Sequence, residues 1–262
     1  MAKPRIPIVS VQNFQMKFGD KTVIHDLSFE VQPGEIFGLL GSNGSGKTTT
    51  IRTLLGLIRP TAGELLIAGE PFSPSSQTAV GYLPEERGLY RKETVIDTMK
   101  YFGALRGLKN PKQWSETYLA RVGLADKAKE KMEKLSSGQQ QKVQLGLTIM
   151  SEPALLILDE PTKGFDPVNR RLLMDIIKEL HAKGTAVLLI THYMDEVEKL
   201  CDRALLLKNG TACAYGTIKE IKKDFGGKSL DEIFVKIYSN SQDDFFNPFR
   251  AKKSVKKKAK NV

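Results

Sequence analysis

The spacing of hydrophobic residues changes twice along the chain, from a β pattern to a helical pattern and back. Residues 1–40 are dense in β-branched residues, and Leu27, Phe29 and Val31 alternate with polar neighbours, which predicts antiparallel strands. From about residue 93 to residue 150 the hydrophobic residues recur at helical spacing instead. The residues that we expect in the core of this helical region are Val95, Ile96, Met99, Phe102, Leu105, Trp114, Tyr118, Leu119 and Val122.

Short apolar runs elsewhere have the length and composition of buried strands. They occupy residues 35–40, 64–68, 79–83, 154–158, 185–190 and 204–207. The predicted helices occupy residues 49–55, 140–150, 167–182 and 194–200. Alternating strands and helices indicate a mostly parallel sheet that is covered on both faces. The predicted fold class is therefore α/β, with an N-terminal antiparallel β region and an inserted α-helical subdomain.

A glycine-rich loop follows the run at residues 35–40 and reads Gly41-Ser-Asn-Gly-Ser-Gly-Lys-Thr48. Two glycines followed by Lys and Thr at this spacing match the phosphate-binding P-loop, in which backbone N–H groups turn toward a phosphate. The helix that follows adds its positive end to the site. A chance glycine-rich surface turn is the alternative, and the flanking strand and helix argue against it. The residues that we expect to bind phosphate are Gly41, Ser42, Asn43, Gly44, Ser45, Gly46, Lys47, Thr48 and Thr49.

Two further motifs carry candidate chemistry. The run at residues 154–158 ends in Asp159 and Glu160, and a buried strand that delivers carboxylates at its end is where a P-loop nucleotidase holds its metal ion. The segment Leu135-Ser-Ser-Gly-Gln139 precedes a helix, and its small residues offer N–H groups and hydroxyls to an anion. Alone, the first motif also describes a solvated turn and the second an ordinary helix cap.

Composition and charge limit the cellular compartment and the kind of protein. The chain has 262 residues, a net charge of +10 and two cysteines, which are too few for a disulfide framework and suit a reducing compartment. It has no apolar run of the ~20 residues that a membrane helix needs, and residues 1–5 do not resemble a signal peptide. Residues 250–262 hold seven Lys or Arg and no acid, which leaves +3 for residues 1–249. We expect this basic tail to be disordered.

The four motifs in order, with His192 after a strand as the last, resemble the nucleotide-binding subunit of ATP-binding-cassette (ABC) transporters. The resemblance implies a P-loop NTPase core of the RecA-like type, with ATP and Mg²⁺ as ligands. It also implies two kinds of partner, a second ATP-binding subunit and a polytopic membrane permease subunit. The expected ABC ATPase domain spans residues 1–238, with the α/β core at about 1–84 and 151–238, the helical subdomain at about 85–150 and the basic tail at 239–262.

The resemblance also implies roles for single residues. Glu160 corresponds to the catalytic glutamate and His192 to the switch histidine that contacts the γ-phosphate. Asp159 and Thr48 correspond to the residues that hold Mg²⁺. Phe18 corresponds to the aromatic residue that stacks on adenine, although a phenylalanine there suits the core equally well.

Other residues correspond to parts of the family's dimeric site. The signature residues, which cover the γ-phosphate bound to the other subunit, are Ser136, Ser137, Gly138 and Gln139. Asp166 lies in the loop that couples the two sites. Three residues depart from the family's usual pattern: Ser137 replaces Gly, Lys163 replaces Ser, and Glu85 replaces the Gln that senses Mg²⁺ and the membrane partner. The loop around Glu85, at residues 82–90, resembles a subgroup that serves ABC-2-type exporters.

These observations predict an ATPase that powers transport, and export in particular, from the cytoplasmic face of the membrane. One rival is a soluble ABC ATPase acting on nucleic acid or ribosomes, but only 88 positions separate Lys47 from Leu135, too few for the long coiled coil of such proteins. A small-molecule kinase shares only the P-loop. The lysines of the tail suit anionic lipid or a nucleic acid backbone. A solvated extension is the simpler interpretation, and we regard nucleic acid as an unlikely partner.

Overall fold

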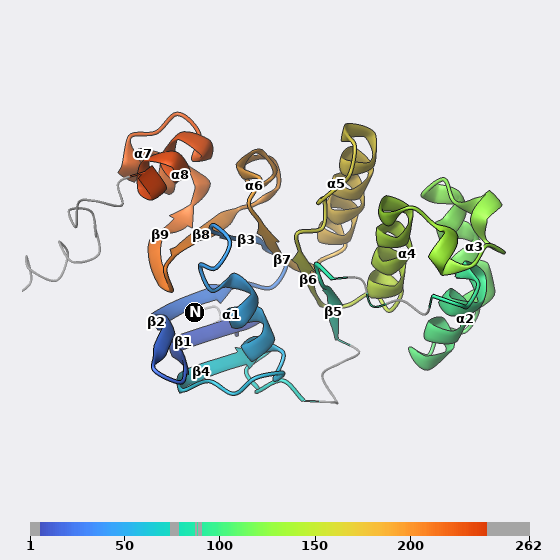
Figure 1. Cartoon of the computed structure of the whole chain (residues 1–262), viewed down its shortest axis with the longest axis horizontal. Helices are drawn as coiled ribbons and strands as arrows, with labels where there is room; N and C mark the ends of the chain where they lie inside the picture. Colours follow the sequence, from blue (N-terminus) through green and yellow to red (C-terminus); the bar gives the residue numbers. More distant parts are fainter. Residues whose placement is uncertain (1–5, 74–78, 87, 89–90, 240–262) are drawn as a thin grey trace, which may run out of the picture.

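The computed structural model describes residues 6–73, 79–86, 88 and 91–239, which form two β-sheets with helices around them (Figure 1). The smaller sheet is antiparallel and has the strand order β2-β1-β4. Its strands are β1 (Val9–Phe18), β2 (Lys21–Val31) and β4 (Ala62–Ile67). Gly19, with a φ of 56°, makes the turn between the first two. This sheet confirms the predicted N-terminal antiparallel region.

The larger sheet has the strand order β5-β6-β7-β3-β8-β9 and is parallel except for its last strand. Its strands are β3 (Ile36–Leu40), β5 (Val80–Leu83), β6 (Leu155–Asp159), β7 (Ala186–Thr191), β8 (Arg203–Lys208) and β9 (Thr211–Thr217). The parallel part confirms the predicted α/β fold. The strands β6, β7 and β3 are adjacent and parallel, so their carboxyl ends meet at one edge of the sheet.

Helices connect these strands. In the α/β core they are α1 (Lys47–Leu54), α5 (Pro167–Ala182), α6 (Met194–Leu200), α7 (Ile218–Phe225) and α8 (Leu230–Ser239). The inserted helices are α2 (Val95–Leu105), α3 (Pro111–Arg121) and α4 (Ser137–Ile149), with 3₁₀ turns at Ala125–Lys127 and Met132–Lys134. The inserted helices gather at one end of the molecule, beside β5 and β6 (Figure 1).

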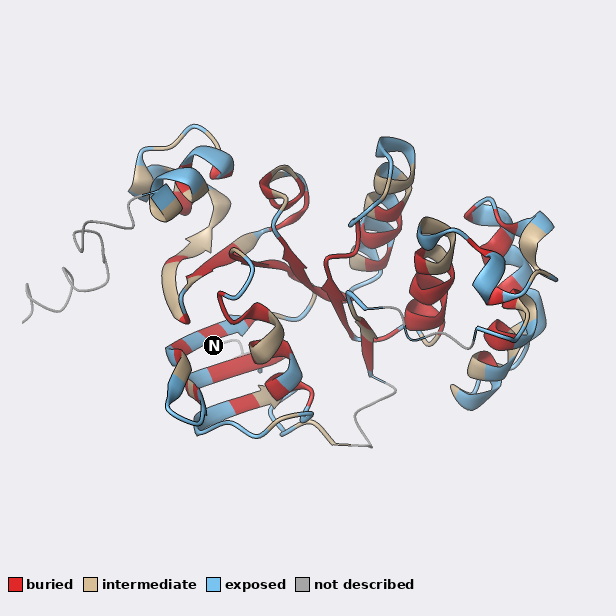
Figure 2. Ribbon diagram, in the orientation of Figure 1, coloured by how far each residue is buried: buried red, intermediate tan, exposed pale blue. Residues whose placement is uncertain are grey.

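The larger sheet separates two hydrophobic cores, because successive side chains of a strand point to opposite faces. In β7, Val187 and Leu189 join one core, whereas Leu188 and Ile190 join the other. The first core contains residues of α2 to α8, and the second contains residues of α1 and the antiparallel sheet. Figure 2 shows the strands of the larger sheet buried along most of their length, except for the half-buried edge strand β9.

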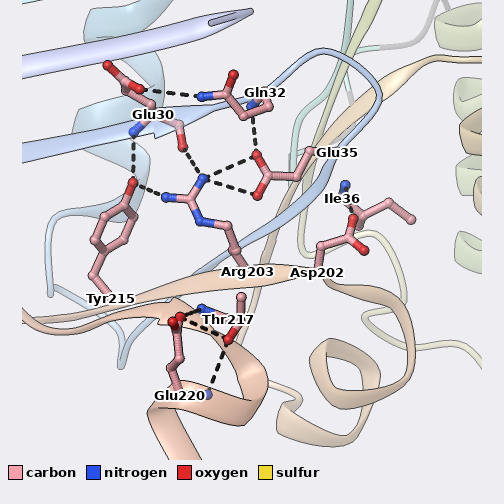
Figure 3. Close-up of polar contacts among 9 residues, drawn as sticks. All are labelled: Glu30, Gln32, Glu35, Ile36, Asp202, Arg203, Tyr215, Thr217 and Glu220. Atoms are coloured by element: carbon pink, nitrogen blue, oxygen red, sulfur yellow. Dashed lines mark hydrogen bonds and ion pairs between the residues drawn. The ribbon is translucent and has the colours of Figure 1, made fainter.

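An arginine network joins the start of β3 to β8 and β9 (Figure 3). The guanidinium group of Arg203 lies 3.3 Å from Glu35 Oε1 and also bonds the hydroxyl of Tyr215. Beside it, Asp202 accepts a hydrogen bond from the backbone N–H of Ile36, at 2.9 Å. Hydrogen bonds to charged groups are stronger than neutral ones and are directional. The network therefore helps to fix the position of β3 relative to β8, and with it the loop that follows β3.

The structure corrects parts of the sequence-based description. Leu105 is 64% exposed, so its expected place in the core was wrong; it is the last residue of α2. The helix expected at residues 140–150 begins at Ser137, and the strand β9 and the helices α7 and α8 were not predicted. The predicted basic tail, apart from Ser239, lies outside the described residues, and so do Arg87, Leu89 and Tyr90.

Candidate functional site

The P-loop connects β3 to α1 and has the geometry of an anion site. Gly46 caps α1 with a φ of 109°, no side chain caps the helix, and its first turn holds no acid. The N–H groups of this first turn therefore point toward the loop, and no capping side chain accepts a hydrogen bond from them. Gly44, with a φ of 79°, has no heavy atom within 4 Å of the place where a Cβ would stand. The loop thus combines left-handed backbone positions with an open, electropositive helix start.

Lys47 reaches back across the loop. Its Nζ donates hydrogen bonds to the carbonyl oxygens of Gly41, at 2.8 Å, and Ser42, at 3.0 Å. The side chain is buried, and this burial lowers its pKa, while the nearby carboxylates of Glu160 and Asp159 act in the opposite direction. A buried ammonium group at the mouth of a P-loop can pair with an anionic ligand.

Asp159 and Glu160 end strand β6 at the same edge of the sheet. Asp159 is 3% exposed; its burial, with the charges of Glu85 and Glu160, raises its pKa to about 6. Glu160 is also buried and has a φ of 50°, a left-handed conformation that is uncommon for a residue with a side chain. Such conformations are frequent at functional sites, where surrounding contacts enforce them. Here the N–H of Glu160 donates to the carbonyl of Ile190 on β7, at 2.8 Å.

His192, which follows β7, is brought to Glu160 by the pairing of β6 with β7. Its Nδ1 lies 2.8 Å from Glu160 Oε2, and its side chain remains 43% exposed. The structure thus places Asp159, Glu160 and His192 at one edge of the sheet, beside the P-loop strand. The catalytic roles of Glu160 and His192 and the Mg²⁺-binding role of Asp159 remain predictions.

Glu85 and Lys163, two of the residues that depart from the usual pattern, contact each other. Glu85 follows β5 and Lys163 follows β6, and Lys163 Nζ lies 2.5 Å from Glu85 Oε1. The hydrogen bond and charge of Glu85 raise the pKa of Lys163, and Glu85 also acts electrostatically on Asp159. Sequence analysis did not predict this pair, because 78 positions separate the two residues.

The signature segment forms the start of α4. The Ser136 side chain accepts a hydrogen bond from the N–H of Gln139, and the Gln139 side chain accepts one from the N–H of Ser136, which makes a capping box. Ser136 and Ser137 are exposed. The helices α4 and α1 lie on opposite sides of β5 and β6 (Figure 1). The structure therefore does not bring the signature to the P-loop of the same chain.

Two predicted contact residues lie at the surface. Phe18 ends β1 and is 52% exposed, so it is not a core residue and its ring is accessible to a ligand. Asp166 caps α5 by accepting hydrogen bonds from the N–H groups of Val168 and Asn169, both at 2.9 Å. These two hydrogen bonds are sufficient to explain an aspartate at the start of α5.

The residues present fit Mg²⁺ as a nucleotide-linked ion. Thr48, at the start of α1, and Asp159 offer the oxygen ligands that Mg²⁺ prefers. Among the described residues, no group of three or more His, Cys, Asp or Glu could hold a metal ion by itself. Mg²⁺ is commonly held by one or two protein oxygens together with substrate phosphates, so this sparse set is sufficient.

Comparisons with known proteins agree with this site. Residues 24–163 match the family model described as "ABC transporter". An ABC transporter ATP-binding protein of Methanocaldococcus jannaschii is 46% identical, over 82% of this chain and 79% of the relative. The linearmycin resistance ATP-binding protein of Bacillus subtilis is 34% identical, over 87% and 75%. The Nod factor export ATP-binding protein I of Burkholderia lata is 36% identical, over 86% and 76%.

A solved structure gives the same result. An ATP-binding subunit of an ABC transporter superposes with a TM-score of 0.81 at 31% identity, covering 88% of this chain and 99% of that one. Within the described residues, no helix is long and apolar enough to cross a membrane. The family match and the named relatives favour the transporter interpretation over a soluble ATPase acting on nucleic acid or ribosomes. The chain belongs to the ABC transporter family, as an ATP-binding subunit whose hydrolysis of ATP powers transport.

Proposed function

We propose that this subunit powers export, working as a dimer at the cytoplasmic face of a membrane with a separate permease subunit of the ABC-2 type. Two relatives support the direction of transport by their names, which refer to Nod factor export and to linearmycin resistance. The loop at residues 82–90 supports the subgroup by its resemblance to the ABC-2 exporters. The absence of a membrane-spanning helix from the described residues fits a pathway that a partner supplies.

The separation of the signature from the P-loop supports the dimer. At the start of α4, Ser136 and Ser137 of the signature are exposed and Gly138 and Gln139 are half-buried, and this helix lies away from α1 of the same chain (Figure 1). A second copy that presents its signature would complete the site around the γ-phosphate. Activity then requires two subunits, either two copies of this chain or this chain with a related one.

The pairing of Glu160 with His192 is the observation that carries the chemistry. Glu160 would accept a proton from a water molecule as its oxygen attacks the γ-phosphorus. The bond from that phosphorus to the β,γ-bridging oxygen breaks, which releases ADP and phosphate. His192, whose Nδ1 lies 2.8 Å from Glu160 Oε2, would hold the carboxylate and contact the γ-phosphate. Mg²⁺ on Thr48 and Asp159, when bound, neutralises charge on the phosphates.

Substitution of Glu160 tests this assignment. A glutamine of the same shape cannot accept the proton, so we expect Glu160→Gln to lower steady-state hydrolysis at least ~100-fold. Binding of ATP should persist, and the ATP-bound variant should elute as a dimer in size-exclusion chromatography with light scattering. Glu152→Gln, at a side chain that is 76% exposed, is the matched control and should hydrolyse ATP normally. Normal turnover by Glu160→Gln would show that another group is the base.

The same variant tests the partner. Tagged Glu160→Gln protein, trapped with ATP in cells and extracted in mild detergent, should copurify with a multi-span membrane protein in stoichiometric amount. That protein would identify the permease and allow the direction of transport to be measured in vesicles. Recovery of ribosomes or nucleic acid, without a membrane protein, would instead favour the soluble ATPase.

A further inference from the structure

The hydroxyl group of Tyr238, near the end of α8, contacts the P-loop. It accepts a hydrogen bond from the backbone N–H of Ser42, at 2.8 Å, and donates one to the carbonyl oxygen of Leu207 on β8, at 2.7 Å. A single hydroxyl thus joins the phosphate loop to the neighbouring strand. Tyr238 lies beyond the residues matched by the family model, which end at residue 163, and in a helix that the sequence did not predict.

The contact lies where the loop leaves the sheet. Leu40 and Leu206 form the last pair between β3 and β8. Beyond it, Gly41 presses against β8 so closely that a Cβ would stand 2.4 Å from the carbonyl oxygen of Leu207. Tyr238 bonds this same carbonyl, and it therefore extends the attachment of the loop to β8 past the end of the strand pairing.

The peptide groups of Ser42 are held from two sides. Tyr238 holds the N–H, and Lys47 Nζ donates to the carbonyl oxygen, at 3.0 Å. In the proposed function Lys47 turns its ammonium group to the phosphates of ATP, so its bond to Ser42 weakens when the ligand binds. The bond from Tyr238 uses the N–H of Ser42, so Ser42 contributes no free N–H to a phosphate in this structure. This bond can keep this part of the loop in place in both states.

Tyr238 is itself well anchored. Its ring stacks on Phe234 with the centroids 4.3 Å apart, and both rings pack against the first hydrophobic core, which contains residues of α2 to α8. Lys208 on β8 donates a hydrogen bond to the carbonyl of Ile237, at 2.7 Å. Ile233, one turn before Ile237 in α8, is 1% exposed. A hydroxyl on so fixed a ring is a suitable anchor for a loop.

We propose that Tyr238 is a positioning residue for the P-loop, and that α8 is thereby part of the nucleotide site. The hydroxyl preorganises the backbone at Ser42, so that less conformational freedom is lost when phosphate binds. The choice of ATP as ligand rests on the proposed function, whereas the tether between α8 and the loop does not.

The test is Tyr238→Phe, which keeps the ring and removes the hydroxyl. The matched control is Tyr101→Phe, which removes the hydroxyl of a ring that is 55% exposed on α2, away from the loop and from the arginine network. Hydrogen–deuterium exchange on the nucleotide-free proteins reports the amide of Ser42 through peptides that span residues 36–46. Titration with the fluorescent analogue MANT-ATP reports affinity, and steady-state kinetics separate KM from kcat.

We expect exchange at Ser42 to accelerate at least about fivefold in Tyr238→Phe, since the amide loses its protein partner. MANT-ATP affinity should fall about fivefold, which corresponds to about 1 kcal/mol, the typical net value of one hydrogen bond. KM for ATP should rise by a similar factor, with kcat within about twofold of wild type. The control should change none of these.

Three results would overturn the proposal: unchanged exchange at Ser42, faster exchange with unchanged affinity, or equal effects in Tyr101→Phe. A wild-type protein that does not bind MANT-ATP would contradict the proposed function instead. In that case the exchange measurement, which needs no nucleotide, still shows whether Tyr238 holds the loop. The two failures are therefore distinguishable.

Discussion

The buried carboxyl group of Asp159 makes the nucleotide-free protein less stable than it would be without the charge. Burial, with Glu85 and Glu160 nearby, raises the pKa of Asp159 from an ordinary 3.8 to about 6. The native state therefore holds this proton more tightly than the unfolded chain does, and ionisation at neutral pH opposes folding. At about 1.4 kcal/mol per pKa unit, the ionised carboxylate destabilises the fold by roughly 3 kcal/mol above pH 6.

Asp159→Asn removes the charge and nearly preserves the shape of the side chain. We expect the nucleotide-free variant to be more stable than wild type by up to about 3 kcal/mol at pH 7.5, or roughly 6–12 °C in Tm. The gain should shrink as the pH falls from 6 toward 4, because the wild-type carboxyl group becomes protonated in the native state over this range. Near pH 4 the two proteins should differ little.

Urea denaturation in EDTA, followed by circular dichroism between pH 4 and 7.5, measures this difference. Asp126→Asn is the control, since the Asp126 side chain is 72% exposed and its charge is solvated. Addition of Mg²⁺ and ATP should favour wild type, which gains more stability from the ligand that it binds better. A less stable Asp159→Asn protein at pH 7.5, or a difference that does not vary with pH, would refute the reasoning.

Two further predictions concern the loops around the site. Gly41→Ala places a methyl group 2.4 Å from the Leu207 carbonyl oxygen, so we expect a loss of about 1–3 kcal/mol in urea denaturation and no measurable MANT-ATP binding; wild-type stability would contradict the crowding. Lys163→Ser leaves Glu85 unpaired near Asp159, so the Mg²⁺ concentration for half-maximal hydrolysis should fall. Glu85→Gln should raise the Mg²⁺ concentration for half-maximal hydrolysis. In the double variant, Lys163→Ser should have a smaller effect on this concentration. Shifts in the opposite directions would count against the electrostatic account.

Most strands and several helices could be predicted from the sequence because their signals are local. Fully buried strands such as β6 and β7 are continuous apolar runs, and α5 was predicted with the bounds that the structure gives, Pro167–Ala182. The position of Asp159 and Glu160 at the carboxyl end of a buried strand followed from the same signal. His192 was indicated only by the resemblance to the ABC family. The strand β9 escaped because it is an edge strand of mostly half-buried residues and lacks such a run.

Contacts between distant segments could not be predicted. The bond between Ser42 and Tyr238 joins residues 196 positions apart. Tyr238 belongs to the helical hydrophobic pattern of α8, but that pattern does not indicate which loop its hydroxyl contacts. The pair of Glu85 and Lys163 depends on the adjacency of β5 and β6, which a single sequence does not reveal. Leu105 has helical spacing but lies in the last turn of α2, where the core no longer covers that face.

The place of β3 in the middle of the larger sheet has a consequence for the order in which the protein is made. Its partners are β7 and β8, so Phe37 must wait for Leu188 and Arg203 to leave the ribosome before it can pair on either side. Pairings of such long sequence separation form late and slowly. The P-loop therefore becomes a binding site only when most of the chain has been synthesised. A ribosome-bound chain truncated before β8 should not retain ATP. Incomplete subunits would therefore not bind nucleotide during synthesis.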